Sequence, residues 1–117
     1  NWDYDMAFTY LYQYGDPALG VARNYTADQI KKGSPWNNVE GYENPELDKK
    51  WAAAAIEPDN AKRQELYTEI QQQIVEDVPV AWLLEIEFPT IYRCNVKNLI
   101  TTGIGLNDGL RDAWIEQ

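Results

Sequence analysis

Carboxylates are the most abundant side chains in this sequence that could carry out chemistry. Asp3 and Asp5 lie at the start of the chain, and Asp16 follows shortly after. A pair of carboxylates can exchange protons with a substrate or bind a hard cation. Each of these three also fits a simpler role. Asp3 and Asp5 suit the solvated face of a strand, and Asp16 suits a turn cap before Pro17. The sequence favours these structural roles.

Several common catalytic groups are missing. The sequence contains no His, Ser34 is its one Ser and Cys94 its one Cys. A Ser-His or Cys-His catalytic pair therefore cannot form within the chain, and neither can a zinc site built from Cys and His. No Gly-rich phosphate-binding loop occurs. We therefore expect a protein that is not an enzyme and that binds neither metal nor cofactor.

Aromatic side chains gather early in the chain. Tyr10, Tyr12 and Tyr14 alternate with other residues, and Trp36 follows in a loop rich in turn-forming residues. Rings at the end of a strand can stack on a sugar or pack against the apolar part of a ligand. Rings at alternate positions can also fill a core. From the sequence alone, a ligand-binding surface and a core remain equally open for this cluster.

The composition excludes other classes of partner. The chain has 117 residues and a net charge of −9, from 19 acidic and 10 basic residues. Nucleic-acid binding needs clustered Lys and Arg, and so does docking on an anionic membrane surface. No apolar run reaches the ~18 residues that a membrane span requires. We expect a protein that binds neither nucleic acid nor an anionic membrane surface.

Two helices are predicted in the middle of the chain. Asn44 followed by Pro45 predicts a helix from 44 to about 56, with Leu47, Trp51 and Ala54 or Ala55 on its buried face. Pro58 interrupts it, and Asp59 can cap a second helix over about 60–76. In this second helix an apolar stripe faces the core and Arg63 belongs to the solvated face. The stripe consists of Leu66, Tyr67, Ile70, Ile74 and Val75.

Strands are predicted on either side of these helices. Residues 2–10 alternate between apolar and polar side chains, with a period of two. Residues 80–84 form a short continuous apolar run, which is typical of a buried strand. A last helical turn is predicted over 110–115. The order strand, helices, strand predicts an α/β or α+β architecture.

Three segments in a fixed order resemble the C-terminal part of one family. The segments are Trp2-Asp3-Tyr4-Asp5-Met6-Ala7-Phe8 with Tyr14-Gly15-Asp16-Pro17, then Asn38 to Asp48, then Arg63 to Trp82. They are similar to the family 5 extracellular solute-binding proteins, the peptide- and nickel-type receptors of ABC importers. Each motif alone is weak, and their shared order and spacing carry the resemblance.

The resemblance implies a fold and a domain division. The chain would be part of an α/β, two-lobed periplasmic binding protein-like fold, in which helices pack on a mixed sheet. Residues 1–84 would belong to the second lobe. Residues 85–117 would contain the hinge crossing and a tail that belongs to the first lobe. The full protein would then be several times longer, and a piece without its partner lobe would tend to self-associate.

The resemblance also implies a function. The chain would belong to the substrate-binding component of an ABC importer, which captures an oligopeptide, a sugar-like solute or another polar solute. Its partners would be that solute and the permease subunits in the membrane. Such proteins are periplasmic or extracellular, either free or lipid-anchored. The absence of an export signal from this chain says nothing about its location.

Gln13 departs from the family pattern. Peptide-binding members place an Asp at the position of Gln13, where it holds the α-ammonium group of the ligand. A neutral amide cannot replace a carboxylate there, because leaving a buried charge unpaired costs about 3–5 kcal/mol. Gln can hydrogen-bond neutral hydroxyl or amide groups. We therefore expect a sugar-like solute, another neutral polar solute or an N-blocked peptide.

Arg23 is a further candidate for ligand binding. It follows the Asp16-Pro17 turn and could pair with an anionic group on the ligand. The alternative is a structural ion pair with Asp16 or Asp28. Together with Arg23, the predicted ligand-binding residues are Tyr10, Tyr12, Gln13, Tyr14 and Trp36.

Two other functions remain open. The first is a fragment of a carboxylate-dependent glycoside hydrolase, which needs two carboxyl groups about 5–9 Å apart across one cleft. The second is a helical protein-interaction module formed by residues 44–76. An apolar stripe of ordinary width is more simply explained as the core of a lobe.

Overall fold

The chain divides into two compact units. The computed structural model describes residues 3–10 and 15–117. One unit spans Asn1–Trp82 and the other Leu83–Gln117. The boundary predicted from the resemblance, between residues 84 and 85, falls close to this division. The assignment of the two parts to two lobes stays a prediction.

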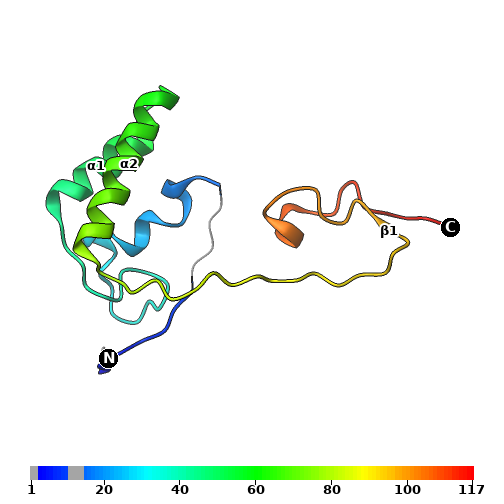
Figure 1. Cartoon of the computed structure of the whole chain (residues 1–117), viewed down its shortest axis with the longest axis horizontal. Coiled ribbons are helices and arrows are strands. Elements are labelled where there is room, and N and C mark those ends of the chain that lie inside the picture. The colour runs from blue at the N-terminus through cyan, green and yellow to red at the C-terminus, as the bar shows by residue number, and fades with distance from the viewer. Residues whose placement is uncertain (1–2, 11–14) are drawn as a thin grey trace. The chain divides into compact units, whose positions relative to one another are not determined.

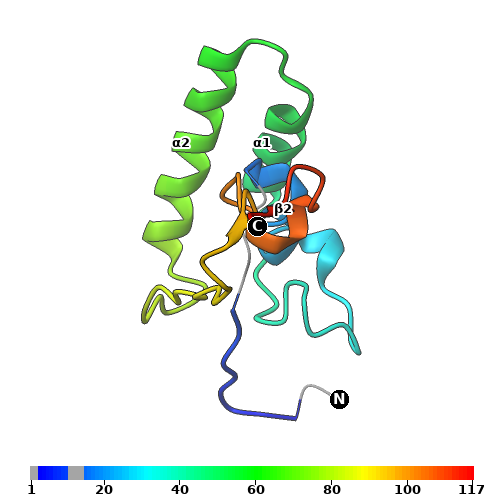
Figure 2. The same ribbon diagram turned by 90° about the vertical axis from the view of Figure 1, so that its right-hand side faces the viewer.

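A helical hairpin forms the centre of the first unit. Helix α1 spans Pro45–Ile56 and helix α2 spans Asn60–Asp77. They lie side by side, drawn in green (Figures 1 and 2). The Asn44 side chain accepts the Leu47 N–H at the start of α1, and Asp59 accepts two N–H groups at the start of α2. Both predicted helices and both predicted caps are confirmed.

The core of this unit lies between the two helices. Its buried apolar side chains are Tyr25, Leu47, Trp51, Ala54, Ile70 and Ile74. The predicted face of α1 is therefore confirmed. The predicted stripe of α2 is correct for Ile70 and Ile74 and wrong for Val75, which is 55% exposed. Val75 follows Ile74 by one residue, a rotation of about 100° around the helix that points its side chain away from α1.

A buried amide holds the loop before α1 in place. The Asn38 side chain is fully buried. Its Nδ2 donates to the carbonyl oxygens of Thr26, at 3.1 Å, and Tyr42, at 2.7 Å, while its Oδ1 accepts the Tyr42 N–H at 2.9 Å. Buried polar groups are stable only when their hydrogen bonds are satisfied. Asn38 therefore fastens residues 38–42 to the turn at Thr26.

The second unit contains the one sheet among the residues that the structure describes. Strand β1, Val96–Lys97, pairs antiparallel with β2, Trp114–Ile115, so that Val96 lies opposite Ile115. Lys97 Nζ pairs with Glu116 at 3.0 Å beside this ladder. The helical turn predicted over 110–115 is wrong, because Trp114 and Ile115 pair with β1.

The two predicted strands at residues 2–10 and 80–84 lie outside any ladder that the structure describes. Residues 3–10 are exposed throughout, on both faces of the alternating pattern. The burial predicted for residues 80–84 holds only in part, because Val80 packs on the core whereas Trp82, Leu83 and Leu84 are 56–74% exposed. A pattern of apolar and polar residues predicts an extended backbone. A β-ladder also needs a neighbouring strand, which such a pattern does not reveal. The α/β lobe architecture therefore stays a proposal.

Candidate functional site

Asp16 is the centre of a polar cluster that joins the start of a short helical turn to α2. It precedes a short 3-10 helix, Pro17–Leu19, and its Oδ1 accepts the Ala18 N–H at 2.9 Å. Pro17 occupies the first helical position, where no backbone N–H is needed. The turn cap predicted for Asp16 is confirmed.

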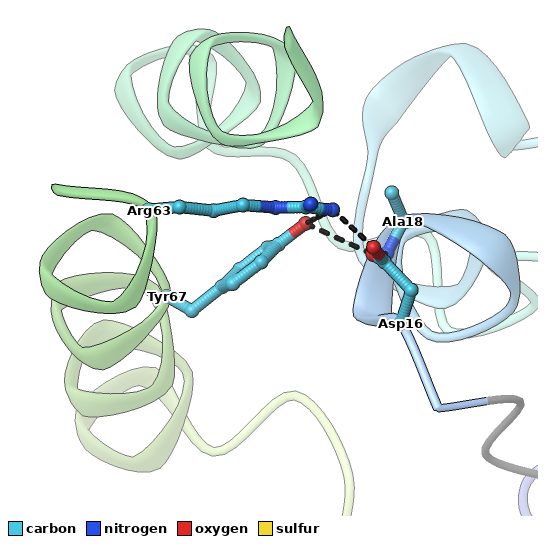
Figure 3. A network of polar contacts seen from close by, with 4 residues as sticks. All are labelled: Asp16, Ala18, Arg63 and Tyr67. Atoms are coloured by element: carbon cyan, nitrogen blue, oxygen red, sulfur yellow. Dashed lines mark hydrogen bonds and ion pairs between the residues drawn. The ribbon is translucent and has the colours of Figure 1, made fainter. Parts of the chain in front are cut away.

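Two side chains of α2 reach Asp16. Arg63 Nη2 forms an ion pair with Asp16 Oδ2, and the Tyr67 hydroxyl lies 3.3 Å from Asp16 Oδ1 (Figure 3). Arg63 and Tyr67 are one helical turn apart, so both point the same way. We call Asp16, Arg63 and Tyr67 the Asp16 clamp. It joins the Asp16-Pro17 turn to α2.

The clamp corrects two expectations. Arg63 is not on a solvated face, since only 27% of its side chain is exposed. Arg23 lies in the short 3-10 helix Ala22–Asn24 with an exposed side chain, and within the described residues it forms no ion pair with Asp16 or Asp28. Arg63 occupies the position at Asp16 that Arg23 was expected to fill.

The clamp keeps Asp16 ionised. The Ala18 N–H, Arg63 and the Tyr67 hydroxyl stabilise the carboxylate and hold the pKa of Asp16 below its ordinary value. The pKa of Arg63 is raised by its hydrogen bond to Tyr67 and by Asp16. A carboxylate with a lowered pKa is a poor proton donor at neutral pH. Asp16 is therefore suited to a structural role and not to general acid catalysis.

Aromatic contacts connect the clamp to the core. The Arg63 guanidinium lies 5.6 Å from the centre of the Tyr67 ring, within the range of a cation–π contact. On the core side, the rings of Tyr67 and Trp51 have centroids 5.9 Å apart at 59°. Trp51 is itself buried. The geometry of the clamp is thus tied to the packing of α1 against α2.

An open depression of about 440 Å³ adjoins the clamp. One side is formed by Gly15, Asp16 and Pro17, and the rest by α2. The lining side chains of α2 are Asn60, Arg63, Gln64, Tyr67, Thr68 and Gln71. Because Asp16 and Arg63 compensate each other, the remaining lining offers amide and hydroxyl groups. Such groups hydrogen-bond neutral polar molecules.

Tyr10 and Trp36 are the two predicted ring residues that the structure brings together. Their ring centroids are 5.9 Å apart with the planes at 72°, an edge-to-face contact. Tyr10 is 45% and Trp36 49% exposed, so this pair belongs to the surface and not to the core. Tyr12, Gln13 and Tyr14 lie outside the described residues. Their ligand-binding role stays a prediction.

Glu40 is a second carboxyl group with an unusual environment. Burial raises its pKa, and the backbone N–H groups of Glu40 and Val39 offset part of that effect. A raised pKa can mark a general acid. A glycoside hydrolase also needs a second carboxylate nearby, yet within the described residues no neighbouring acid contributes to the pKa shift of Glu40. The glycoside hydrolase alternative therefore stays a prediction.

The described part of the chain contains neither a cluster of metal-ligating side chains nor a membrane-spanning helix. Among residues 3–10 and 15–117, no group of three or more His, Cys, Asp or Glu side chains could hold a metal ion. No helix described by the structure has both the length and the apolar character needed to cross a membrane.

Comparisons with protein-family models, with curated proteins and with solved structures found no match for this chain. The resemblance to solute-binding proteins therefore rests on the three sequence segments described above alone, and membership of that family stays a prediction.

Arg63 and Tyr67 were absent from the site predicted from the sequence. The sequence offered one signal for them. Arg63 and Tyr67 are one helical turn apart on a predicted helix, so both could reach a distant carboxylate such as Asp16. That signal is common on helices, where such residues usually face solvent. Only the position of Asp16 beside α2 in the folded chain distinguishes them.

Proposed function

We propose that this chain is part of the substrate-binding component of an ABC importer and that it has no enzymatic activity. It contributes one side of a site that captures a small polar solute for delivery to a membrane permease. The three segments shared with family 5 solute-binding proteins support this function. The observation that carries it structurally is the surface pair formed by Tyr10 and Trp36.

The Tyr10–Trp36 pair has the properties of a ligand-binding surface. Each ring is about half exposed, so apolar area remains available to a ligand. Aromatic rings provide a large contact area at low cost in side-chain entropy, because few bonds rotate. Two such rings held edge to face can contact the apolar face of a sugar or a compact side chain.

The chemistry around this pair favours a neutral solute. Gln13 stands where a peptide receptor would have the Asp that holds an α-ammonium group. The Asp16 carboxylate, which follows three residues later in the sequence, already binds Arg63 and Tyr67. A sugar-like solute or an N-blocked peptide needs no free carboxylate partner. We therefore propose a neutral polar ligand for this site.

Nuclear magnetic resonance titrations of the 117-residue chain test the proposal. With millimolar cellobiose, the indole signal of Trp36 and the amide signal of Tyr10 are expected to shift. Trialanine, which has a free ammonium group, is expected to leave them in place. Trp36→Ala removes the cellobiose response, whereas Trp114→Phe, a change in the second unit, preserves it.

The outcomes separate the possible functions. Strong binding of trialanine contradicts the neutral-ligand assignment. Absence of any response to cellobiose, to trialanine and to acetyl-trialanine contradicts solute binding by this chain. Release of nitrophenol from an aryl glycoside supports a glycoside hydrolase in place of a carrier.

A further inference from the structure

The depression beside the Asp16 clamp lies between two parts of the chain that are far apart in sequence. Residues 15–17 form one wall, and one face of α2 forms the other. Its volume of about 440 Å³ falls within the ~300–1,000 Å³ that is typical of small-molecule sites. The ion pair between Asp16 and Arg63 joins the two walls (Figure 3). The concave shape therefore depends on a contact within the fold.

The α2 wall carries uncharged hydrogen-bonding groups. Asn60, Gln64, Thr68 and Gln71 are spaced by three or four residues, so they share one face of the helix, and all four are exposed. In the described part of the chain, the three side-chain amides make no hydrogen bond, and the Thr68 hydroxyl donates to the Gln64 carbonyl at 2.8 Å. The amide groups and the lone pairs of the Thr68 hydroxyl are therefore available to a ligand.

Two rings add an apolar surface to the same depression. Pro17 and Tyr67 both line it, and both are partly exposed. The Tyr67 ring is held between Trp51, whose ring centroid is 5.9 Å away, and the Arg63 guanidinium. A ring that is already held in place loses little side-chain entropy when a ligand packs against it.

The charges in the depression favour a neutral ligand. Asp16 and Arg63 are its two charged lining residues, and they pair with each other while only 30% and 27% of their side chains are exposed. An anion would compete with Asp16 for Arg63, and a cation would compete with Arg63 for Asp16. Either exchange leaves a partly buried charge without its partner, which is unfavourable. A neutral ligand leaves the ion pair intact.

We propose that this depression binds one ring of a neutral sugar. Each sugar hydroxyl both donates and accepts hydrogen bonds, which matches side-chain amides, since these present a donor and an acceptor together. The C–H face of the sugar ring packs against Pro17 and Tyr67. The site shares no residue with the Tyr10–Trp36 pair, and it does not rest on the importer function.

Nuclear magnetic resonance titrations of the 117-residue chain with the methyl glycosides of glucose, galactose and mannose test this site. At least one glycoside is expected to shift the side-chain amide signals of Gln64 and Gln71, and to saturate with a Kd on the order of millimolar. Inorganic phosphate at the same concentrations is expected to leave these signals in place, because Arg63 is already paired with Asp16.

A double variant tests the role of the free amides. Gln64→Ala/Gln71→Ala removes two of them and is expected to raise the Kd of the glycoside by roughly tenfold, measured at the backbone amide of Thr68. Gln72→Ala is the matched control, because Gln72 is an exposed residue of α2 that does not line the depression. Its Kd is expected to equal that of the wild type. Alanine is the best helix former, so both variants keep α2, which circular dichroism verifies.

Several results would overturn the inference. One is that none of the three glycosides shifts the signals of Gln64 and Gln71, or that the shifts fail to saturate. Another is that the double variant binds the glycoside as tightly as Gln72→Ala does. Phosphate that shifts these signals as strongly as the glycosides would assign the depression to an anion. The Trp36 indole and Tyr10 amide signals report on the other pair of rings, so the two assignments can fail separately.

Discussion

A single carboxylate, Asp16, connects the beginning of the chain to its longest helix. Its Oδ1 accepts the Ala18 N–H, and Arg63 and Tyr67 bind it from α2. The capping bond is local, whereas the other two contacts span 47 and 51 residues of sequence. The same side chain therefore caps the start of the Pro17–Leu19 turn and anchors that turn to α2.

The lowered pKa of Asp16 predicts acid sensitivity. A carboxylate with a lowered folded-state pKa stabilises the protein above the unfolded pKa, here 3.8, and the stability is lost as the pH falls through the folded value. Asp16→Asn is expected to cost about 1 kcal/mol at pH 7, and the difference from wild type is expected to shrink below pH 4.

Urea unfolding of both proteins at pH 7 and pH 3 measures this difference. Asp3→Asn, at an exposed position, is the control and is expected to follow the wild type at both pH values. If the free energies of unfolding of Asp16→Asn and wild type differed by the same amount at pH 7 and pH 3, an ionic role for Asp16 would be contradicted.

At the scale of the element, α2 ends at a strained residue. Val78 adopts the left-handed conformation, with φ 47° and ψ 53°, and its N–H donates to the Ile74 carbonyl. This conformation costs an L-residue ~1–2 kcal/mol, and the following Pro79 restricts Val78 further. The reversal at Val78 precedes Val80, which packs on the core.

Val78→Gly is expected to stabilise the protein by about 1 kcal/mol, because glycine adopts this conformation without strain. Little burial is lost, since Val78 is 57% exposed. Val75→Gly is the matched control. Val75 is 55% exposed inside α2, where glycine is expected to destabilise by about 1 kcal/mol. In thermal unfolding, the melting temperature should therefore rise for Val78→Gly and fall for Val75→Gly.

At the scale of the whole molecule, the helices and the buried core all belong to one unit. The two α-helices and the core residues lie within Asn1–Trp82. Val80, two residues before the end of this unit, still packs against the core. This unit should therefore fold without residues 83–117.

A chain that ends at Trp82 is expected to keep nearly all of the helical circular dichroism and to unfold cooperatively. A chain that ends at Pro58 retains α1 but loses Ile70 and Ile74, which cover Leu47 and Trp51. It is expected to be largely unfolded, because isolated helices of this length are marginal in water. Loss of helix in the longer chain would show that the two units fold together.

The sequence by itself determined the two helices. Asn44, Pro45, Pro58 and Asp59 mark their boundaries through contacts that span only a few residues, so the signals are complete in the local sequence. The cap at Asp16 was predictable for the same reason. The buried face of α1 followed from the helical period.

The tertiary structure alone decided which residues meet across long separations. Arg63 and not Arg23 reaches Asp16, Trp36 meets Tyr10, and Asn38 is buried between two turns. It also decided that the apolar run at Trp82–Leu84 is exposed. Alternation and hydrophobicity describe what one segment could bury. Whether those side chains are buried depends on whether another segment packs against them in the folded protein.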